Sequence, residues 1–283
     1  MTSQALTRRI FLLGNATKPS VNAAFSRMAA WLDDRRQLAG SDLDGKPERV
    51  NDSDPEFVIA MGGDGTILHA VQAMQKRQVP IVGVNMGKLG YLADFDENEV
   101  YQSLDALLDR PELVSRRLMF DVTIESPKGD QWSGVALNDC VIRVGDPFRT
   151  VLLEIHIDDQ PLCTLAGDGV ILATPTGSTA HNMSCGGPIV ESGADAIIVT
   201  PRCAHSFTHR PVVVSGRSKV SVRVMPQSVG ASVVLDGQCV RPVTPDARIR
   251  LVRSACDAQL VRNPKRRLWD TLISKLKWGV DVT

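Results

Sequence analysis

The N-terminal third of the chain alternates between short apolar runs and segments with helical periodicity. Phe25, Met28, Ala29 and Leu32, for example, follow the i, i+3, i+4, i+7 spacing of one helix face. The apolar runs predict buried strands over residues 10–13, 57–61 and 80–85. The periodic segments predict helices over residues 21–32, 67–78 and 100–108. This alternation predicts a Rossmann-like α/β domain over residues 1–116, with a parallel sheet covered on both faces.

Residues 33–54 interrupt the alternation with a polar stretch. The stretch contains Gly40, Gly45 and Pro47, and it shows neither strand nor helix periodicity. We therefore expect an exposed loop here. A loop of this length within a compact domain is often disordered or a mobile lid.

From residue 117 to about 255, apolar residues alternate with polar ones at period two. The alternating positions are Val122/Ile124, Leu153/Ile155/Ile157, Val220/Val222/Val224 and Ile249/Leu251. Asp158-Asp159-Gln160 and Asp236-Gly237 are typical turn sequences. These features predict an antiparallel, β-sandwich-like second domain, so that the fold class is α/β plus all-β.

The tail, residues 256–283, is predicted to return to helix between residues 264 and 278. Its apolar stripe consists of Leu268, Trp269, Leu272, Ile273 and Leu276, with basic residues opposite. A basic amphipathic helix can lie on a membrane. A terminal helix more often packs its apolar face on a domain, and we expect this one to pack on the N-terminal domain.

The composition is that of a globular protein and narrows the classes of function. In 283 residues, 32 Lys and Arg balance 32 Asp and Glu, and the lack of a basic excess argues against nucleic acid as a partner. No apolar run approaches the ~18 residues of a transmembrane helix, so no membrane partner is expected. Six scattered cysteines without a C-x-x-C pair indicate a reducing, cytoplasmic setting.

One cluster, Cys203, His205 and His209, has the residue types of a metal site. It supplies three ligands at most, and no fourth ligand follows nearby in the sequence. We interpret it as part of a polar loop and predict no metal-binding residue.

The strongest local signal is residues 61–66, Met-Gly-Gly-Asp-Gly-Thr, between a predicted strand and a predicted helix. The glycines allow a tight turn and a close approach of the backbone to a ligand. The helix N-terminus favours phosphate, and the carboxyl end of a parallel strand is where α/β sheets bind ligands. Asp64 in this turn is suited to take a proton from a hydroxyl or to hold a metal.

Known phosphate-binding patterns do not fit this turn. The P-loop spacing is absent, and the dinucleotide pattern G-x-G-x-x-G fails at Leu68. A glycine-rich turn in which Asp64 merely caps the helix stays an alternative.

Two further stretches are rich in small polar residues. Residues 167–188 carry glycine, serine and threonine around the end of a strand at Thr174-Pro175. Their short donors and acceptors suit the edge of a base or a ribose, although a Ser/Thr turn with helix capping has the same composition. Asn138-Asp139 follows a short apolar run and alone predicts only a turn.

Taken together and in this order, the three stretches resemble the NAD kinase family over nearly the whole chain. Residues 62–66 match its GGDGT turn, Asn138-Asp139 its Asn-Glu/Asp pair, and residues 167–188 its long glycine- and threonine-rich loop. Shorter matches occur at residues 15–19, 87–92 and 210–213. The resemblance implies phosphorylation of the 2′-hydroxyl of the adenosine ribose of NAD with ATP, giving NADP.

The resemblance also implies the roles of individual residues. Asp64 would act as general base on the 2′-hydroxyl, and Asn138 and Asp139 would contact the adenine and ribose hydroxyls. The other implied substrate-binding residues are Gly65, His69, Asp168, Thr176, Thr179, Ala180, His181, Ser184 and Gln238. Mg²⁺ bound with ATP is the implied cofactor, polyphosphate an alternative donor, and a homo-oligomer, dimer or tetramer, the implied assembly through the β-rich domain.

Two positions depart from the family pattern. His181 stands where Tyr is usual, which reduces stacking and adds a titratable ring. Ala166 stands where some members have a basic residue, and His69 either compensates in part or is a surface helix residue. Two alternative functions stay open: a lipid or diacylglycerol-type kinase, which has a similar turn, and a non-catalytic NAD(P) sensor on the same fold.

Overall fold

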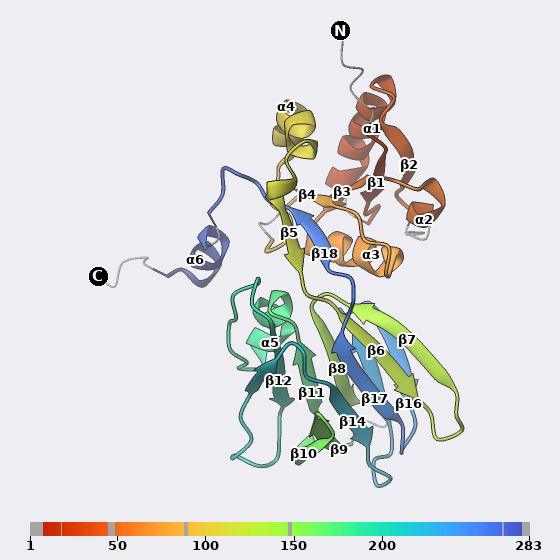
Figure 1. The fold of residues 1–283 in the computed structure, drawn as a ribbon, viewed down its shortest axis with the longest axis vertical. Helices are drawn as coiled ribbons and strands as arrows, with labels where there is room; N and C mark the ends of the chain where they lie inside the picture. The colour runs from red at the N-terminus through yellow and green to blue at the C-terminus, as the bar shows by residue number, and fades with distance from the viewer. Residues whose placement is uncertain are drawn as a thin grey trace. The chain divides into compact units, whose positions relative to one another are not determined.

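The computed structural model describes residues 8–17, 19–44, 49–87, 90–146, 149–267 and 269–278. The chain forms two compact units, Met1–Arg116 with Ala258–Thr283, and Arg117–Asp257 (Figure 1). The chain therefore leaves the first unit once and returns to it after the second unit is complete.

A six-stranded sheet forms the centre of the first unit, in the order β2-β1-β3-β4-β18-β5. Its strands are β1 (Ile10–Gly14), β2 (Leu38–Asp42), β3 (Phe57–Gly62), β4 (Ile81–Asn85), β5 (Val114–Arg117) and β18 (Ala258–Val261). β1 pairs in parallel with β2 and β3, and β4 pairs in parallel with β3 and β18. The Rossmann-like parallel sheet predicted from the apolar runs is confirmed for these strands.

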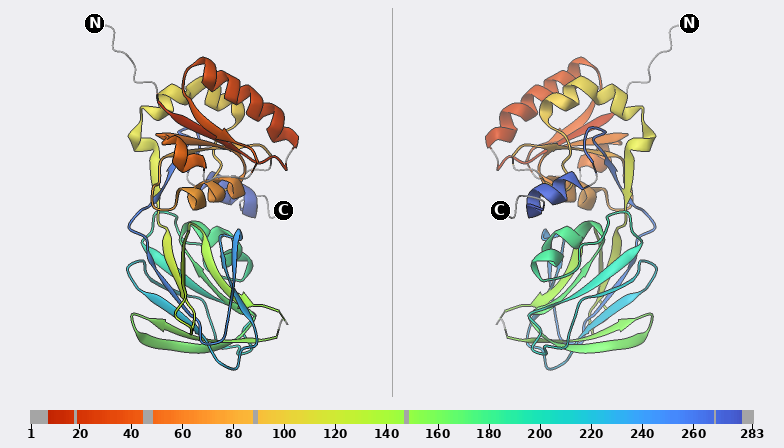
Figure 2. Two further views of the ribbon diagram at one scale, coloured as in Figure 1. Left: turned by 90° about the vertical axis from the view of Figure 1, so that its right-hand side faces the viewer. Right: turned by 90° about the vertical axis from the view of Figure 1, so that its left-hand side faces the viewer.

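Helices cover both faces of this sheet. They are α1 (Pro19–Asp34), α2 (Arg49–Ser53), α3 (Asp64–Met74) and α4 (Glu97–Leu108); the unit also contains α6 (Asp270–Leu276) and a 3₁₀ turn η1 (Pro111–Leu113). α1 and α4 lie on one face, and α2 and α3 lie on the other (Figure 2). Because both faces are covered, β1 and β3 are buried along their whole length, which explains their continuous apolar sequences.

The exposed loop predicted over residues 33–54 is wrong for most of its length. Leu38–Asp42 is strand β2, and Arg49–Ser53 is helix α2, whereas residues 45–48 lie outside the described residues. β2 is the edge strand beside β1 and is mostly only half-buried. An edge strand of this kind needs no apolar run, so its sequence lacks the signal on which the prediction rested.

The C-terminal tail belongs to the first unit, but its secondary structure differs from the prediction. Ala258–Val261 joins the first sheet as β18, and the helix is confined to Asp270–Leu276. Within α6 only Leu272 is buried, whereas Ile273 is 43% exposed. The Lys275 ammonium lies 4.4 Å from the centre of the Tyr91 ring. No helix in the described part of the chain is long and apolar enough to cross a membrane.

The second unit consists of two six-stranded sheets with antiparallel pairing, in the orders β10-β9-β14-β17-β6-β7 and β13-β12-β11-β8-β15-β16. The first contains β6 (Phe120–Glu125), β7 (Gln131–Ala136), β9 (Val151–Ile157), β10 (Gln160–Gly167), β14 (Val220–Val224) and β17 (Arg248–Arg253). The second contains β8 (Asp139–Val144), β11 (Gly169–Ala173), β12 (Ala196–Arg202), β13 (Val212–Ser215), β15 (Ala231–Leu235) and β16 (Cys239–Val243).

The core of this unit lies between the two sheets (Figure 2). Val122 and Leu153 enter it from the first sheet, and Ile142 and Leu172 enter it from the second. Every second residue of β6 and β14, and of β9 as far as Ile155, is buried, because only one face of their sheet meets the core. The predicted antiparallel β-sandwich is therefore confirmed.

Candidate functional site

The Gly-Gly-Asp-Gly turn connects β3 to α3 and places Asp64 at the first position of the helix. Gly63 is extended and occupies the N-cap without a side-chain cap bond. A Cβ on Gly62 would lie 2.2 Å from Oγ1 of Thr66, so glycine is needed for the close packing of the turn on its helix. Asp64 is therefore not the N-cap residue of α3.

The Asp64 carboxylate is held by backbone N–H groups of the segment that follows β4. Oδ2 accepts from the N–H of Tyr91 at 2.8 Å, and Oδ1 accepts from those of Leu92 at 3.0 Å and Ala93 at 3.3 Å. An added Cβ on Gly90 would lie 2.0 Å from Oδ1, so only glycine permits this segment to approach the carboxylate. The three donors orient a half-buried carboxylate at the N-terminal, positive end of α3.

Two other predicted residues lie on α3. Gly65 is exposed, and among the described residues nothing outside its own stretch of helix lies within 4 Å of the position that a Cβ would take. His69 lies further along the same helix and is half-buried. Gly65 therefore leaves space directly beside the Asp64 backbone for a ligand.

In the second unit, a cavity of about 340 Å³ brings together four of the predicted substrate-binding residues: Asn138, Asp139, Ala180 and His181. The rest of its lining consists of Val141, Arg143, Val234, Asp236, Gly237 and Val240. Residues far apart in the sequence meet here because β8 lies between β11 and β15 in the second sheet. The segment after β11, with η2 (Thr176–Thr179) and α5 (His181–Ser184), packs against this sheet through Cys185 and Val190.

The Asn138–Asp139 turn is clamped between two neighbouring elements. The Thr174 hydroxyl, at the end of β11, donates to the Leu137 carbonyl at 2.6 Å, and the Thr174 N–H donates to the Asn138 carbonyl at 2.9 Å. From the β15–β16 turn, the Asp236 carboxylate accepts from the N–H groups of Leu137 at 2.9 Å, Asn138 at 2.7 Å and Asp139 at 3.1 Å. These bonds fix the backbone that carries the two polar side chains.

Burial and charge change the acid–base behaviour of the cavity. Burial and then the negative charge of Asp236 raise the pKa of Asp139 to about 7. Burial and the positive charges of Arg202 and Arg143 lower the pKa of His181. Near neutral pH the ring of His181 is therefore uncharged, while Asp139 exchanges between its two forms.

The Ser/Thr-rich loop contains both structural and available polar groups. Ser178 bonds both the N–H and the carbonyl of Val190, and the fully buried Asn182 bonds Ser178, Pro188 and Thr200. Thr176 differs, because its Oγ1 is buried and has no hydrogen-bond partner among the described residues. Thr176 therefore carries a buried hydroxyl that the structural hydrogen bonds of this loop do not use.

The remaining predicted residues of the second unit do not line the 340 Å³ cavity. Thr179 donates to the Thr176 carbonyl at 3.4 Å, and Ser184 is exposed. Asp168 lies between β10 and β11 and bonds the side chain of Cys203, whose pKa it raises. Gln238 is exposed beyond the Asp236-Gly237 turn.

Sequence reasoning missed two of the charged lining residues, Asp236 and Arg143. Asp236 was visible only as part of an Asp-Gly turn sequence. Arg143 lies on β8 four residues after Asp139, so the even spacing along a strand places both on one sheet face.

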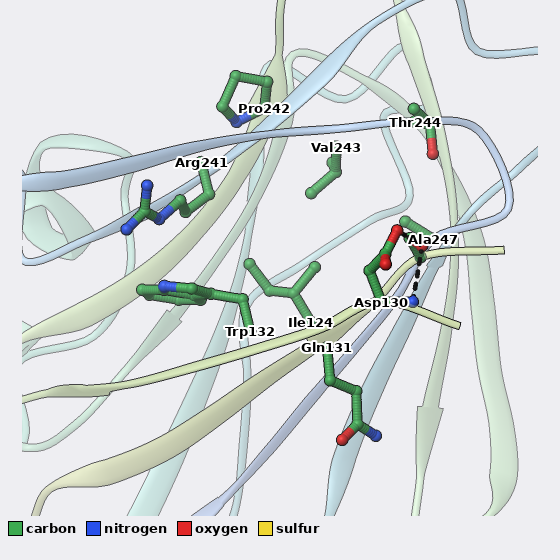
Figure 3. A pocket seen from close by; sticks show the side chains of 10 residues that line it. Ile124, Asp130, Gln131, Trp132, Arg241, Pro242, Val243, Thr244 and Ala247 are labelled. Carbon is green, nitrogen blue, oxygen red and sulfur yellow. Dashed lines mark hydrogen bonds between the residues drawn. The ribbon is translucent and has the colours of Figure 1, made fainter. Parts of the chain in front are cut away.

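A second cavity in this unit, of about 320 Å³, contains none of the predicted site residues (Figure 3). Ile124, Val243 and Ala247 form its apolar part, and the Arg241 guanidinium lies 4.9 Å from the centre of the Trp132 ring. Trp132 and Arg241 come from β7 and β16, which are edge strands of the two sheets. The cavity lies where the sandwich is open between these edges.

Two family models match this chain one after the other, and relatives with known names match it over most of its length. Residues 12–112 match the ATP-NAD kinase N-terminal domain, and residues 137–263 match the ATP-NAD kinase C-terminal domain. The chain is 33% identical over 278 residues to the NAD kinase of Desulforamulus reducens, covering 95% of this chain and 96% of that protein. It is 32% identical over 281 residues to the NAD kinase of Geobacter sulfurreducens, covering 96% and 99%.

Two solved structures share the fold over most of both chains. Yeast NADH kinase, solved in complex with NADH, has a TM-score of 0.87 at 21% identity, covering 99% of this chain and 90% of its own. An NAD kinase from Archaeoglobus fulgidus, solved in complex with ATP, has a TM-score of 0.76 at 27% identity, covering 95% and 98%.

Proposed function

The chain belongs to the ATP-NAD kinase family, and we propose that it transfers a phosphoryl group from ATP to the 2′-hydroxyl of the adenosine ribose of NAD, giving NADP. The observation that carries this proposal is the Asp64 carboxylate. It begins α3 between two glycines and is oriented by three backbone donors. Solved relatives described with NADH and with ATP support the two substrate classes.

Asp64 is the proposed general base. A ribose hydroxyl is a weak nucleophile near neutral pH, so a carboxylate placed beside it assists its deprotonation. Asp64 would take the 2′-hydroxyl proton while the ribose oxygen bonds to the γ-phosphorus of ATP and the bond to ADP breaks. Catalysis of phosphoryl transfer is otherwise mostly positioning and charge stabilisation, which the N-terminus of α3 supplies for the phosphates.

The second-unit cavity is proposed to hold the adenosine part of NAD. Asn138 offers an amide, and Asp139 a carboxyl, to the base and ribose hydroxyls. Thr176 does not line this cavity; its buried hydroxyl, which has no hydrogen-bond partner among the described residues, is proposed to contact the substrate from the loop after β11. Gly65, His69, Asp168, Thr179, Ala180, His181, Ser184 and Gln238 complete the proposed substrate contacts.

Mg²⁺ is proposed to accompany ATP and to neutralise charge on the donor phosphates. Among the described residues, no three His, Cys, Asp or Glu side chains come together as a metal site. Donor phosphates and water, with one or two carboxylates at most, would then supply the ligands, as is usual for this ion. We also propose a cytoplasmic homo-oligomer, dimer or tetramer, and polyphosphate as a second donor to be tested.

The test is NADP formation by the wild-type protein and by Asp64→Asn, with the exposed Asp52→Asn as a matched control. We expect Asp64→Asn to lose about 10² to 10⁴ of kcat, the usual contribution of a general base. Asp52→Asn should keep wild-type turnover. Near-normal kcat in correctly folded Asp64→Asn would overturn the assignment of the base.

The same assay separates the alternative functions. The donors are ATP and polyphosphate, each with and without Mg²⁺, and the acceptors are NAD, NADH and diacylglycerol. Phosphorylation of diacylglycerol but not of NAD would indicate a lipid kinase, and NAD binding in calorimetry without NADP formation would indicate a sensor.

A further inference from the structure

Asp236 is held in a backbone conformation that few residue types adopt. It lies between β15 and β16 with φ at 51°, followed by Gly237 with φ at 69°. Two consecutive left-handed residues make the tight hairpin turn that Asp-Gly favours. Asp236 is only 7% exposed, so its charge lies inside the protein beside the cavity of Asn138 and Asp139.

The side chain of Asp236 acts on the neighbouring strand as well as on its own turn. It accepts hydrogen bonds from three consecutive N–H groups, of Leu137, Asn138 and Asp139, with both oxygens in use. A carboxylate suits this task, because it accepts several bonds and carries no donor that would oppose the amides. A turn that only had to reverse the chain would need none of these bonds.

We propose that Asp236 is a positioning residue for nucleotide binding: it fixes the Asn138–Asp139 turn through the backbone, and its negative charge adds to the effect of burial in favouring the protonated form of Asp139. The inference rests on the proposed function, since it assigns a role in binding NAD. Asp236 would not touch the reacting atoms.

The effect of Asp236 on the protonation of Asp139 is judged against the other charged and titratable groups that face Asp139. These others are Arg143, from the strand of Asp139, and His181 from α5, whereas Asp236 comes from the β15–β16 turn. Asp236 is the charged neighbour that raises the pKa of Asp139, after the larger effect of burial. The carboxylate form of Asp139 accepts bonds from ribose hydroxyls, so NAD binding should strengthen as pH rises through about 7.

Asp236→Asn tests both parts of the proposal. Asn tolerates the left-handed conformation, but it has one acceptor oxygen and no charge. We expect the KM for NAD to rise about tenfold, with less than about a threefold change in kcat. Because Asp139 loses a negative neighbour, its pKa should fall, and the midpoint of the pH dependence of the NAD Kd should move to lower pH.

Asp159→Asn is the matched control. Asp159 also occupies a left-handed position of a hairpin turn in the same unit, with φ at 63°, and it is exposed. This variant should keep the wild-type KM and the wild-type midpoint. A folded Asp236→Asn that behaves like this control would overturn the inference, while NADP formation by the wild type would leave the proposed function standing.

Asp139→Asn keeps the inference testable if Asp236→Asn does not fold. It removes the titrating group and leaves the Asp236 charge in place, so the midpoint near pH 7 should disappear. A midpoint that persists in Asp139→Asn would show that another group titrates, which contradicts the proposal. Absence of NADP formation by the wild type would instead contradict the proposed function itself.

Discussion

Replacing Asp139 by Asn should stabilise the protein, and the gain should depend on pH. Asp139 is only 4% exposed, and its pKa is about 7 in the folded state against 3.8 for an ordinary aspartate. Between these two values the folded state binds a proton that the unfolded state releases, so stability falls as pH rises through this window. Above pH 7 the full penalty of burying the charge is present.

The magnitude follows from the difference between the two pKa values. It is about 3 units, and one unit corresponds to about 1.36 kcal/mol, so the penalty above pH 7 is about 4 kcal/mol. At pH 5, which is little more than one pH unit above the pKa of Asp139 in the unfolded chain, the penalty is about 2 kcal/mol. The neutral amide of Asn resembles the protonated acid in shape and escapes this penalty.

The assay is urea unfolding of the wild type, Asp139→Asn and the exposed control Asp159→Asn at pH 5, 6, 7 and 8. The stability advantage of Asp139→Asn should grow from pH 5 to pH 7 and then level off, whereas the control should follow the wild type. An advantage that does not change with pH, or a variant less stable than the wild type at pH 8, would refute the reasoning. The same variant should bind NAD more weakly, because the acceptor carboxylate is lost.

Two further substitutions test how the backbone around the site is built. Gly90→Ala would place a Cβ 2.0 Å from Oδ1 of Asp64, so we expect kcat for NADP formation to fall more than tenfold. Gly87→Ala should leave kcat unchanged, because no described residue other than its chain neighbours comes within 4 Å of the new Cβ. Thr174→Val removes the hydroxyl that donates to the buried Leu137 carbonyl, and it should lower the unfolding free energy by about 1–3 kcal/mol in urea titrations; an unchanged value would mean that the bond does not hold the turn.

The pattern of apolar residues along the chain predicted two kinds of strand: those buried on both faces of a sheet, and those buried on one face only. β1, β3 and β4 are central strands, and their continuous apolar runs were sufficient to place them. The period-two residues of β6, β9, β14 and β17 likewise predicted one sheet of the sandwich. β2 and β18 were missed, because an edge strand and a strand of four residues carry little pattern of their own.

The candidate site likewise has features that the sequence predicted and features that it did not. The composition and the order of the sequence were sufficient to select the glycines around Asp64 and the small polar residues of the 167–188 loop as candidate site residues. The partners of Asp64 did not, because the segment of Tyr91 that holds the carboxylate lies 27 residues further along the chain. Nor did the role of Asp236, which bonds Asn138 across 98 residues.

The sequence by itself determined the succession of elements, the glycine turn with its carboxylate, and the family that the chain resembles. These follow from local periodicity and from residue types at fixed spacing, and both involve residues that are close together in the sequence. Only the tertiary structure decided which amides orient Asp64, which carboxylate clamps the Asn138–Asp139 turn, and that Asp139 titrates near neutral pH. Those properties depend on burial and on charges that strand pairing brings close together, and neither can be predicted from the residues adjacent along the chain.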